Sequence, residues 1–239
     1  MMRWLWLVGG LLAVCLHGVG ETPPETPGPP AEARPEIVRL SATRSRLGLI
    51  EFDHTSREIT IPAEINMVKG LLEYALVGEK GKLHEALLST KARVFDLNIV
   101  LLLLNYQPDE QWFVPPAKPK PLAASKPAAR LEIFVRWKEA GRGPDLTARL
   151  DEWITDMTTK KPAAPAPWVY TGSHLNEEKQ FAAEVDGSFV ALYHDARALI
   201  NSPREGADND EQWAPAPAVP PKGTPVTVVI RSRPVDASG

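Results

Sequence analysis

The sequence predicts an α+β domain in which a mostly antiparallel sheet packs on one short buried helix, at about residues 94–104. Short apolar segments alternate with clusters of Gly, Asp and Pro, which is typical of strands joined as hairpins. Residues 97–104 are almost wholly apolar, but the run is shorter than the roughly 20 residues that a bilayer requires. A helix that is apolar on nearly all sides is expected to be buried, so we place the sheet around it.

The N-terminal 20 residues have the features of an export signal. Arg3 supplies the positive charge, residues 5–16 the apolar segment, and residues 18–20 the small side chains that a signal peptidase reads. We therefore expect a signal peptide at 1–20 and cleavage before Glu21. A second interpretation is a lipoprotein signal in which Cys15 becomes the lipidated first residue. Both predict a protein exported to the periplasm or cell envelope, and cleavage would leave no membrane-spanning segment.

We expect a single domain at 36–231. Prolines make residues 21–35 an extended tether. A second proline-rich segment, 115–127, reads as a surface insertion within the domain, and residues 232–239 as a disordered tail.

Cysteine content and charge exclude several classes of function. Cys15 is the only cysteine, so a cleaved chain contains no disulfide, thiolate metal ligand, cysteine nucleophile or iron–sulfur cluster of its own. The formal net charge of −3, with no basic run, predicts no nucleic-acid partner. The cofactor and the partner are otherwise unknown, an envelope protein being one candidate partner.

Periodicity assigns the individual elements. Asp96 lies in the first turn expected for the helix, and Asn105 can take the left-handed conformation that ends it, although a buried strand at 99–104 fits the periodicity as well. Asp186-Gly187 predicts a two-residue turn, and hence a hairpin at 181–194 with one apolar face. Further strands are expected at 47–52, 58–67, 71–77, 130–137, 146–150, 168–170 and 225–231.

No phosphate-binding loop, Gly-x-Ser-x-Gly or His-Glu-x-x-His occurs in the sequence. The polar residues nearest the apolar strands are the candidate binding residues, and they are Lys82, His84, Glu85, His174, His194 and Asp195.

These candidates allow several hypotheses. If His84, His174 and His194 converge, they would form a zinc or copper site with a nearby carboxylate. Acid–base chemistry by His84 with Glu85 or Asp195 is a second hypothesis, but neighbours on an extended strand face opposite ways. The alternative is that these are solvated or structural residues. Four tryptophans next to loops could line a binding surface or cover the edges of a core: Trp112, Trp153, Trp168 and Trp213.

Several segments together resemble the YdjY-type domain of exported bacterial proteins. They occur in the order GLLEYALVGEKGKLHEALL, LNIVLLLL, WVYTGSH, AEVDGSFVALYHD, ALINSP and GTPVTVVI, from Val68 to Ile230. The resemblance implies a single exported domain without an established activity, and it singles out five of the candidates as motif positions: Lys82, His84, Glu85, His194 and Asp195. Some relatives are described as ferredoxin-like or occur with iron–sulfur modules, whereas this chain has no cysteine after residue 15.

The sequence thus supports three hypotheses about function. The first is a non-catalytic binding or structural module of the cell envelope. The second is a metal-binding protein or metal-dependent enzyme using His84, His174 and His194. The third is an accessory subunit of a membrane redox system whose cofactor lies in another chain.

Overall fold

The computed structural model describes residues 36–114, 118–119, 124–139 and 143–232. The expected signal peptide, cleavage site, lipidation site, tether and nearly all of the tail lie outside these residues, as does much of the proline-rich insertion. None of the described helices has the length and apolar character needed to cross a membrane.

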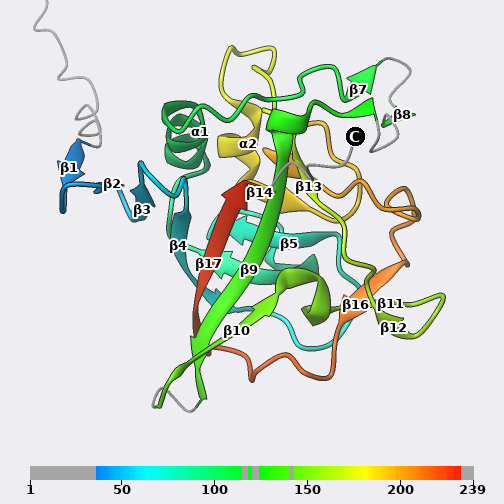
Figure 1. The fold of residues 1–239 in the computed structure, drawn as a ribbon. Coiled ribbons are helices and arrows are strands. Elements are labelled where there is room, and N and C mark those ends of the chain that lie inside the picture. Colours follow the sequence, from blue (N-terminus) through cyan, green and yellow to red (C-terminus); the bar gives the residue numbers. More distant parts are fainter. Residues whose placement is uncertain (1–35, 115–117, 120–123, 140–142, 233–239) are drawn as a thin grey trace, which may run out of the picture. The chain divides into compact units, whose positions relative to one another are not determined.

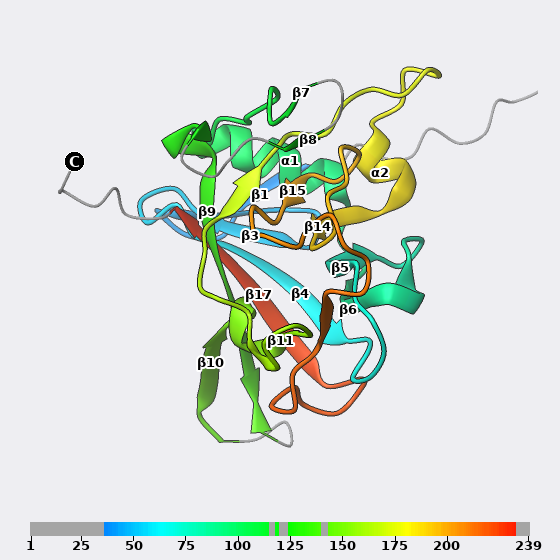
Figure 2. The same cartoon turned by 90° about the vertical axis from the view of Figure 1, so that its right-hand side faces the viewer.

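A sheet that closes on itself forms the centre of the domain (Figures 1 and 2). Among the described residues, eight strands make the circuit, and the pairing of the last with the first closes it. In order around the sheet they are β4 (Ile59–Ile65), β17 (Pro225–Ser232), β9 (Arg130–Lys138), β13 (Trp168–Tyr170), β15 (Ile200–Asn201), β14 (Ser188–Ala191), β5 (Tyr74–Gly78) and β6 (Ala86–Thr90). The pairs β5–β6 and β14–β15 are parallel and the other six are antiparallel.

Further strands extend or flank this barrel. β1 (Ile37–Arg39), β2 (Arg44–Leu47) and β3 (Ile50–Asp53) continue the sheet outward from β4, and β10 (Asp145–Arg149) pairs with β9. Two small sheets contain β11 (Ile154–Asp156), β12 (Lys161–Pro162) and β16 (Trp213–Pro215), and β7 (Phe113–Val114) and β8 (Lys118–Pro119). The helices are α1 (Val94–Leu103) and α2 (Ala182–Asp186), with 3-10 turns at Leu83–Glu85, Pro127–Ala129 and Leu150–Trp153.

Alternating side chains explain why the long antiparallel strands enclose a core. Leu131, Ile133 and Val135 of β9 are fully buried, while the residues between them are half-exposed. β17 pairs with β9 from Val226 to Ser232 and points Val228 and Ile230 to the same side. The side chains of strands therefore fill the interior, as is usual for a closed antiparallel sheet.

The predicted fold class, α+β with the sheet packed on a buried helix, is therefore wrong, because the protein is mostly β and its sheet packs on itself. The helix itself is confirmed at Val94–Leu103, and Asn105 follows it with φ of 59°. One side of α1, including Leu97 and Val100, joins the core. The opposite side is open, since Phe95 is 40 % exposed and Leu102 49 %.

The hairpin predicted at 181–194 is also wrong. Residues 182–186 form α2, and Gly187 follows it in the left-handed conformation, with φ of 63°. The same Asp-Gly pair that favours a tight hairpin turn also suits a helix end followed by glycine. The glycine is required for a second reason, because a Cβ on residue 187 would lie 3.0 Å from the backbone nitrogen of Gly81.

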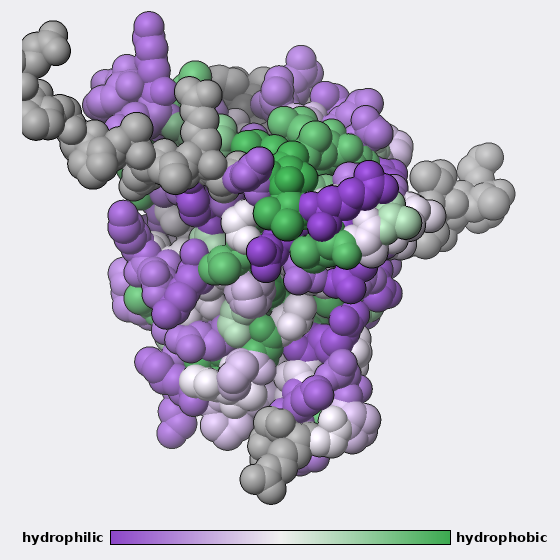
Figure 3. Space-filling model, turned by 90° about the vertical axis from the view of Figure 1, so that its left-hand side faces the viewer, coloured by the Kyte–Doolittle hydropathy of each residue, from purple (hydrophilic) through white to green (hydrophobic). Residues whose placement is uncertain are grey.

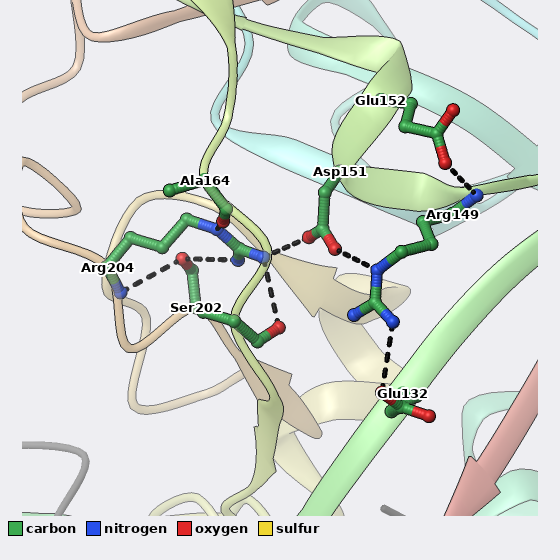
Figure 4. A network of polar contacts seen from close by, with 8 residues as sticks. Glu132, Arg149, Asp151, Glu152, Ala164, Ser202 and Arg204 are labelled. Carbon is green, nitrogen blue, oxygen red and sulfur yellow. Dashed lines mark hydrogen bonds and ion pairs between the residues drawn. The ribbon is translucent and has the colours of Figure 1, made fainter.

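A network of charged residues links β9 to the segments that follow it (Figure 4). Arg204, only 8 % exposed, forms an ion pair with the buried Asp151 and also donates to Ser202 Oγ at 3.2 Å. The other oxygen of Asp151 accepts from Arg149 Nε at 3.1 Å, and Arg149 Nη1 reaches Glu132 Oε1 at 3.0 Å. Each charge in this chain of contacts is compensated, as buried charges require.

Candidate functional site

Two of the six predicted residues, Lys82 and Glu85, meet on the outer face of β5 and β6. These strands are parallel and Tyr74 is in register with Ala86, so the residues that precede them lie close together. Lys82 Nζ lies 3.0 Å from Glu85 Oε1 and 3.4 Å from Glu73 Oε2. The ammonium group is also 5.1 Å from the centre of the Tyr74 ring.

Tyr74 connects this ion-pair group to the loop formed by residues 193–202. Its hydroxyl donates to Asp195 Oδ2 at 2.9 Å. Asp195 Oδ1 in turn accepts from the backbone of Arg197 at 2.8 Å. Asn201, which is fully buried, accepts from the Asp195 backbone N–H at 2.9 Å and donates to Thr171 Oγ1 at 3.0 Å. The contacts fix the loop to the sheet.

The polar cluster formed by Glu73, Tyr74, Lys82, Glu85 and Asp195 keeps its phenol and its ammonium group in their ordinary protonation states near neutral pH. Burial raises the pKa of Tyr74, and so does the neighbouring Asp195, so the phenol stays protonated. Burial lowers the pKa of Lys82, but Glu85 and the other neighbours raise it by more, so the ammonium stays charged. Burial and repulsion from Glu85 raise the pKa of Glu73. A protonated phenol and a charged ammonium are not activated bases or nucleophiles.

The three histidines predicted to converge have separate partners. His174 Nδ1 lies 3.2 Å from Ala196 O, and His194 Nε2 lies 3.0 Å from Ser202 O. Burial lowers the pKa of His194, which favours its neutral form. Over the described part of the chain, no three His, Cys, Asp or Glu side chains are grouped so that they could hold a metal ion.

The segment before β6 is a 3-10 turn and not an extended strand. His84 and Glu85 therefore do not face opposite ways, and His84 Nε2 lies 3.6 Å from Glu85 Oε2. The His84 side chain is nevertheless 79 % exposed and lies at the rim of the cluster.

The four tryptophans next to loops are core residues. Each is at most 2 % exposed, so none lines a surface: Trp112, Trp153, Trp168 and Trp213.

The polar cluster holds the 193–202 loop over a small apolar group on the outside of the sheet. That group is fully covered and consists of Tyr74, Val77, Ala86, Ala191 and Ala198. Five of the six predicted candidates lie in or beside this arrangement, and His174 contacts the same loop through Ala196. The ion pairs and hydrogen bonds of the cluster indicate that Lys82, Glu85 and Asp195 help to hold this loop to the sheet.

A pocket at the opposite end of β5 and β6 was not predicted from the sequence. On one edge of β4, β3 pairs with the start of the strand and β6 with its end. The pocket lies near the edge of β4 between these partners, around Pro62, which has no N–H to donate. It has a volume of about 330 Å³ and is lined by Leu49, Pro62, Ala63, Glu64, Glu79, Ser89, Thr90, Lys91 and Pro225.

Most of the pocket's exposed lining is apolar, with charges at its rim. Lys91 Nζ lies 3.7 Å from Glu79 Oε1, and both side chains are well exposed. Thr90 Oγ1 donates to Pro62 O at 2.6 Å, so this hydroxyl is engaged. A proline inside a strand marks an edge or an interruption of pairing, and that signal at Pro62 could have located the pocket in the sequence.

The fold defines a mostly β domain built on a closed sheet, with a polar cluster and an apolar pocket at opposite ends of its β5–β6 pair. A comparison with protein families identifies it further. The family model of the YdjY domain matches residues 50–231, and the chain belongs to this family. The resemblance noted in the sequence is thereby confirmed. No match was found among curated proteins or among solved structures.

Proposed function

We propose that this protein is an exported cell-envelope domain that binds a small ligand with an apolar body and an amino group, without catalysing a reaction on it. The observation that carries the proposal is the pocket beside β4. Its volume of about 330 Å³ and its largely apolar lining suit a small molecule or one side chain of a peptide.

The charges at the rim determine the kind of ligand. Glu64 and Glu79 contribute two negative charges and Lys91 one positive charge, and Lys91 lies beside Glu79. Glu64 is exposed and has no ion-pair partner among the described residues. An ammonium group above the pocket could pair with Glu64 while its apolar chain contacts Leu49 and Pro225.

The lining residues support binding in preference to catalysis. They include no histidine or cysteine. The Thr90 hydroxyl is engaged with Pro62 O, and it also accepts from the Ala92 backbone N–H at 3.1 Å. Ser89 lies opposite Glu64 in the pairing of β6 with β4, but among the described residues no hydrogen bond joins these two side chains, and a nucleophile needs an adjacent base to which it is bonded.

Calorimetric titration with three ligands of equal chain length tests the proposal. Hexylamine should bind more tightly than hexanol, and hexanoate should bind most weakly. Glu64→Gln should weaken hexylamine binding about two- to fivefold, the range for one exposed charge pair, and leave hexanol unchanged. Ala63→Leu should fill the pocket and abolish the binding of both hexylamine and hexanol. Glu177→Gln, on a different loop, is the matched control.

Equal affinity for the amine and the carboxylate would contradict the proposed ligand class. Turnover of a bound amine would contradict the non-catalytic part of the proposal.

The export part of the proposal rests on the N-terminal sequence pattern. Expression of the full-length chain in a bacterium with a periplasm should place it in the envelope fraction, with Glu21 as its first residue. A first residue at Cys15 with the added mass of acyl chains would support the lipoprotein alternative. Retention of Met1 in a cytoplasmic fraction would contradict export.

A further inference from the structure

A second hollow adjoins the pocket beside β4 on the outer face of the sheet. It has a volume of about 530 Å³ and lies where β17 runs between β4 and β9. The pocket and the second hollow share part of their lining, namely Pro62, Ala63 and Pro225. Figure 1 shows the three strands side by side, and Figure 3 shows the side of the domain that carries β4, where residues of intermediate hydropathy lie between strongly hydrophilic ones. The pocket and the second hollow therefore form one groove that crosses three neighbouring strands.

The middle of this groove carries no charge and offers few hydrogen-bond donors. Pro62 and Pro225 are exposed on the outer face, and neither has a backbone N–H to donate. Most of the exposed lining of the second hollow is apolar as well, and it includes the half-buried Trp137. The middle of the groove thus suits the apolar body of a ligand and leaves the ligand's charged groups to the two ends.

The pocket end of the groove carries an excess negative charge. Lys91 is paired with Glu79, and Glu64 has no ion-pair partner among the described residues. Glu64 lies opposite Pro225 in the pairing of β4 with β17, so its carboxylate stands beside the middle of the groove.

The other end of the groove carries an excess positive charge. Its charged residues are two cations, Arg136 and Lys138, and one acid, Asp145, which lies opposite Lys138 in the pairing of β9 with β10. Arg136 lies 3.5 Å from Glu58, but Arg231 lies closer to the same carboxyl group, at 2.8 Å. Because two arginines share this one carboxylate, a positive charge remains uncompensated at Arg136.

The pairing of the strands fixes the distance between the two excess charges. Thr227 is paired with Pro62 on one side and with Arg136 on the other, and Pro225 is paired with Glu64. Glu64 and Arg136 are therefore two strands apart across the sheet and two residues apart along it, so their Cα atoms are about 12 Å apart. Both residues alternate with buried ones along their strands, which places their side chains on the same outer face.

We propose that the groove binds a linear zwitterion, whose ammonium group pairs with Glu64 and whose carboxylate pairs with Arg136. The inference rests on the proposed binding of an amine in the pocket and adds the second charge of the ligand. A tripeptide with free termini carries its charges about 10 Å apart, at roughly 3.3–3.6 Å per residue, and an amino acid with a long alkyl chain can match that span. The apolar body lies across Pro62 and Pro225. The reverse orientation would bring like charges together at both ends.

Calorimetric titration of the full chain with ligand pairs that differ only in their terminal charge tests the proposal. At low salt, 8-aminooctanoate should bind about two- to fivefold more tightly than 8-aminooctanamide, the range for one exposed charge pair, and the difference should shrink at high salt. Trileucine should gain similarly over trileucine amide. The tighter of the two zwitterions shows whether the natural ligand is a peptide or an alkyl chain. The shorter 4-aminobutanoate should gain nothing over its amide, because it cannot reach both charges.

Two substitutions locate the carboxylate of the ligand. Arg136→Gln should abolish the preference for 8-aminooctanoate over its amide and leave the affinity for the amide unchanged. Lys138→Gln should reduce the preference by less, because Asp145 lies opposite Lys138. Arg44→Gln is the matched control, because Arg44 also pairs with a glutamate, Glu51, but lines neither the pocket nor the second hollow.

Two results would overturn the proposal while leaving the amine pocket in place. One is equal affinity for 8-aminooctanoate and its amide in a protein that binds hexylamine. The other is a preference for the carboxylate that persists in both Arg136→Gln and Lys138→Gln, which would place the carboxylate elsewhere. If neither hexylamine nor 8-aminooctanamide binds, the proposed function fails and this inference fails with it.

Discussion

Replacing Arg204 by methionine should destabilise the protein strongly, because the guanidinium group is almost completely enclosed. It donates from Nε to Ala164 O at 3.1 Å and from Nη2 to Ala166 O at 3.2 Å, and it forms an ion pair with Asp151. It also lies 4.5 Å from the centre of the Trp168 ring. Methionine keeps much of the apolar stem but supplies none of these hydrogen bonds.

The expected loss of stability follows from the Asp151 carboxylate, which stays buried after Arg204 is removed. Asp151, 1 % exposed, would keep only Arg149 as a charged partner, at 3.1 Å. Removing one partner of a buried ion pair costs about 3–5 kcal/mol, and the remaining arginine places this site toward the lower end, at about 3–4 kcal/mol. For a domain of this size, that is a fall in Tm of about 10 °C.

The loss should depend on pH. Burial raises the pKa of Asp151, while Arg204 and Arg149 lower it, so removing Arg204 raises that pKa further. When a carboxyl group has a higher pKa in the folded than in the unfolded state, the protein loses stability as the pH rises from the unfolded-state pKa to the folded-state pKa. The deficit of Arg204→Met should therefore be largest at neutral pH and shrink as the pH falls toward about 4.

Urea denaturation at pH 7 and pH 5 measures both effects. Arg149→Met is the matched control, because Arg149 is 25 % exposed and its loss leaves the Arg204–Asp151 pair intact. Arg149→Met should lower the free energy of unfolding by roughly half as much as Arg204→Met, or by less. A cost for Arg204→Met below about 1 kcal/mol, or an equal cost for Arg149→Met, would refute the reasoning.

Three further substitutions test other parts of the structure. Gly187→Ala, at φ of 63° and with its new Cβ 3.0 Å from a backbone nitrogen, should cost about 2–3 kcal/mol by thermal denaturation. Gly143→Ala, also at positive φ but with nothing within 4 Å of the Cβ, should cost only about 1–2 kcal/mol, so equal costs would exclude the close packing. Asp96→Asn should raise the free energy of unfolding by about 1 kcal/mol at pH 7, because burial raises the pKa of this carboxyl group, one oxygen of which has no partner. The gain should vanish near pH 4, and a loss at pH 7 would contradict it. Tyr74→Phe should cost about 1 kcal/mol and speed hydrogen exchange in the 193–202 loop, and unchanged exchange there would show that Asp195 does not anchor it.

Sequence periodicity predicts those parts of the fold whose cause is local. Alternation in residues 130–137 and 225–231 correctly gives β9 and β17, and the apolar run before Asn105 correctly gives a helix. Closure of the sheet depends instead on the pairing of β4 with β6, for which no local signal exists. Without that pairing, an almost wholly apolar helix predicts a core centred on itself, and for this reason the sequence predicts the wrong fold class.

The same distinction applies to the candidate site. Lys82 and Glu85 are three residues apart on one turn, so their contact is local, and the sequence identifies both as candidates. The bond between Tyr74 and Asp195 joins residues 121 positions apart, and no spacing in the sequence predicts it. The pocket depends on where two strands stop pairing with β4, and Pro62 is its only local sign.

A titration of the isotopically labelled protein with hexylamine, followed by amide NMR, tests most directly where a ligand binds. If the ligand binds in the pocket and the polar cluster has a structural role, shift changes are expected at Ala63, Glu64 and Lys91, with Lys82 and Asp195 unaffected. Changes centred on Lys82 and Asp195, with none around the pocket, would contradict ligand binding in the pocket.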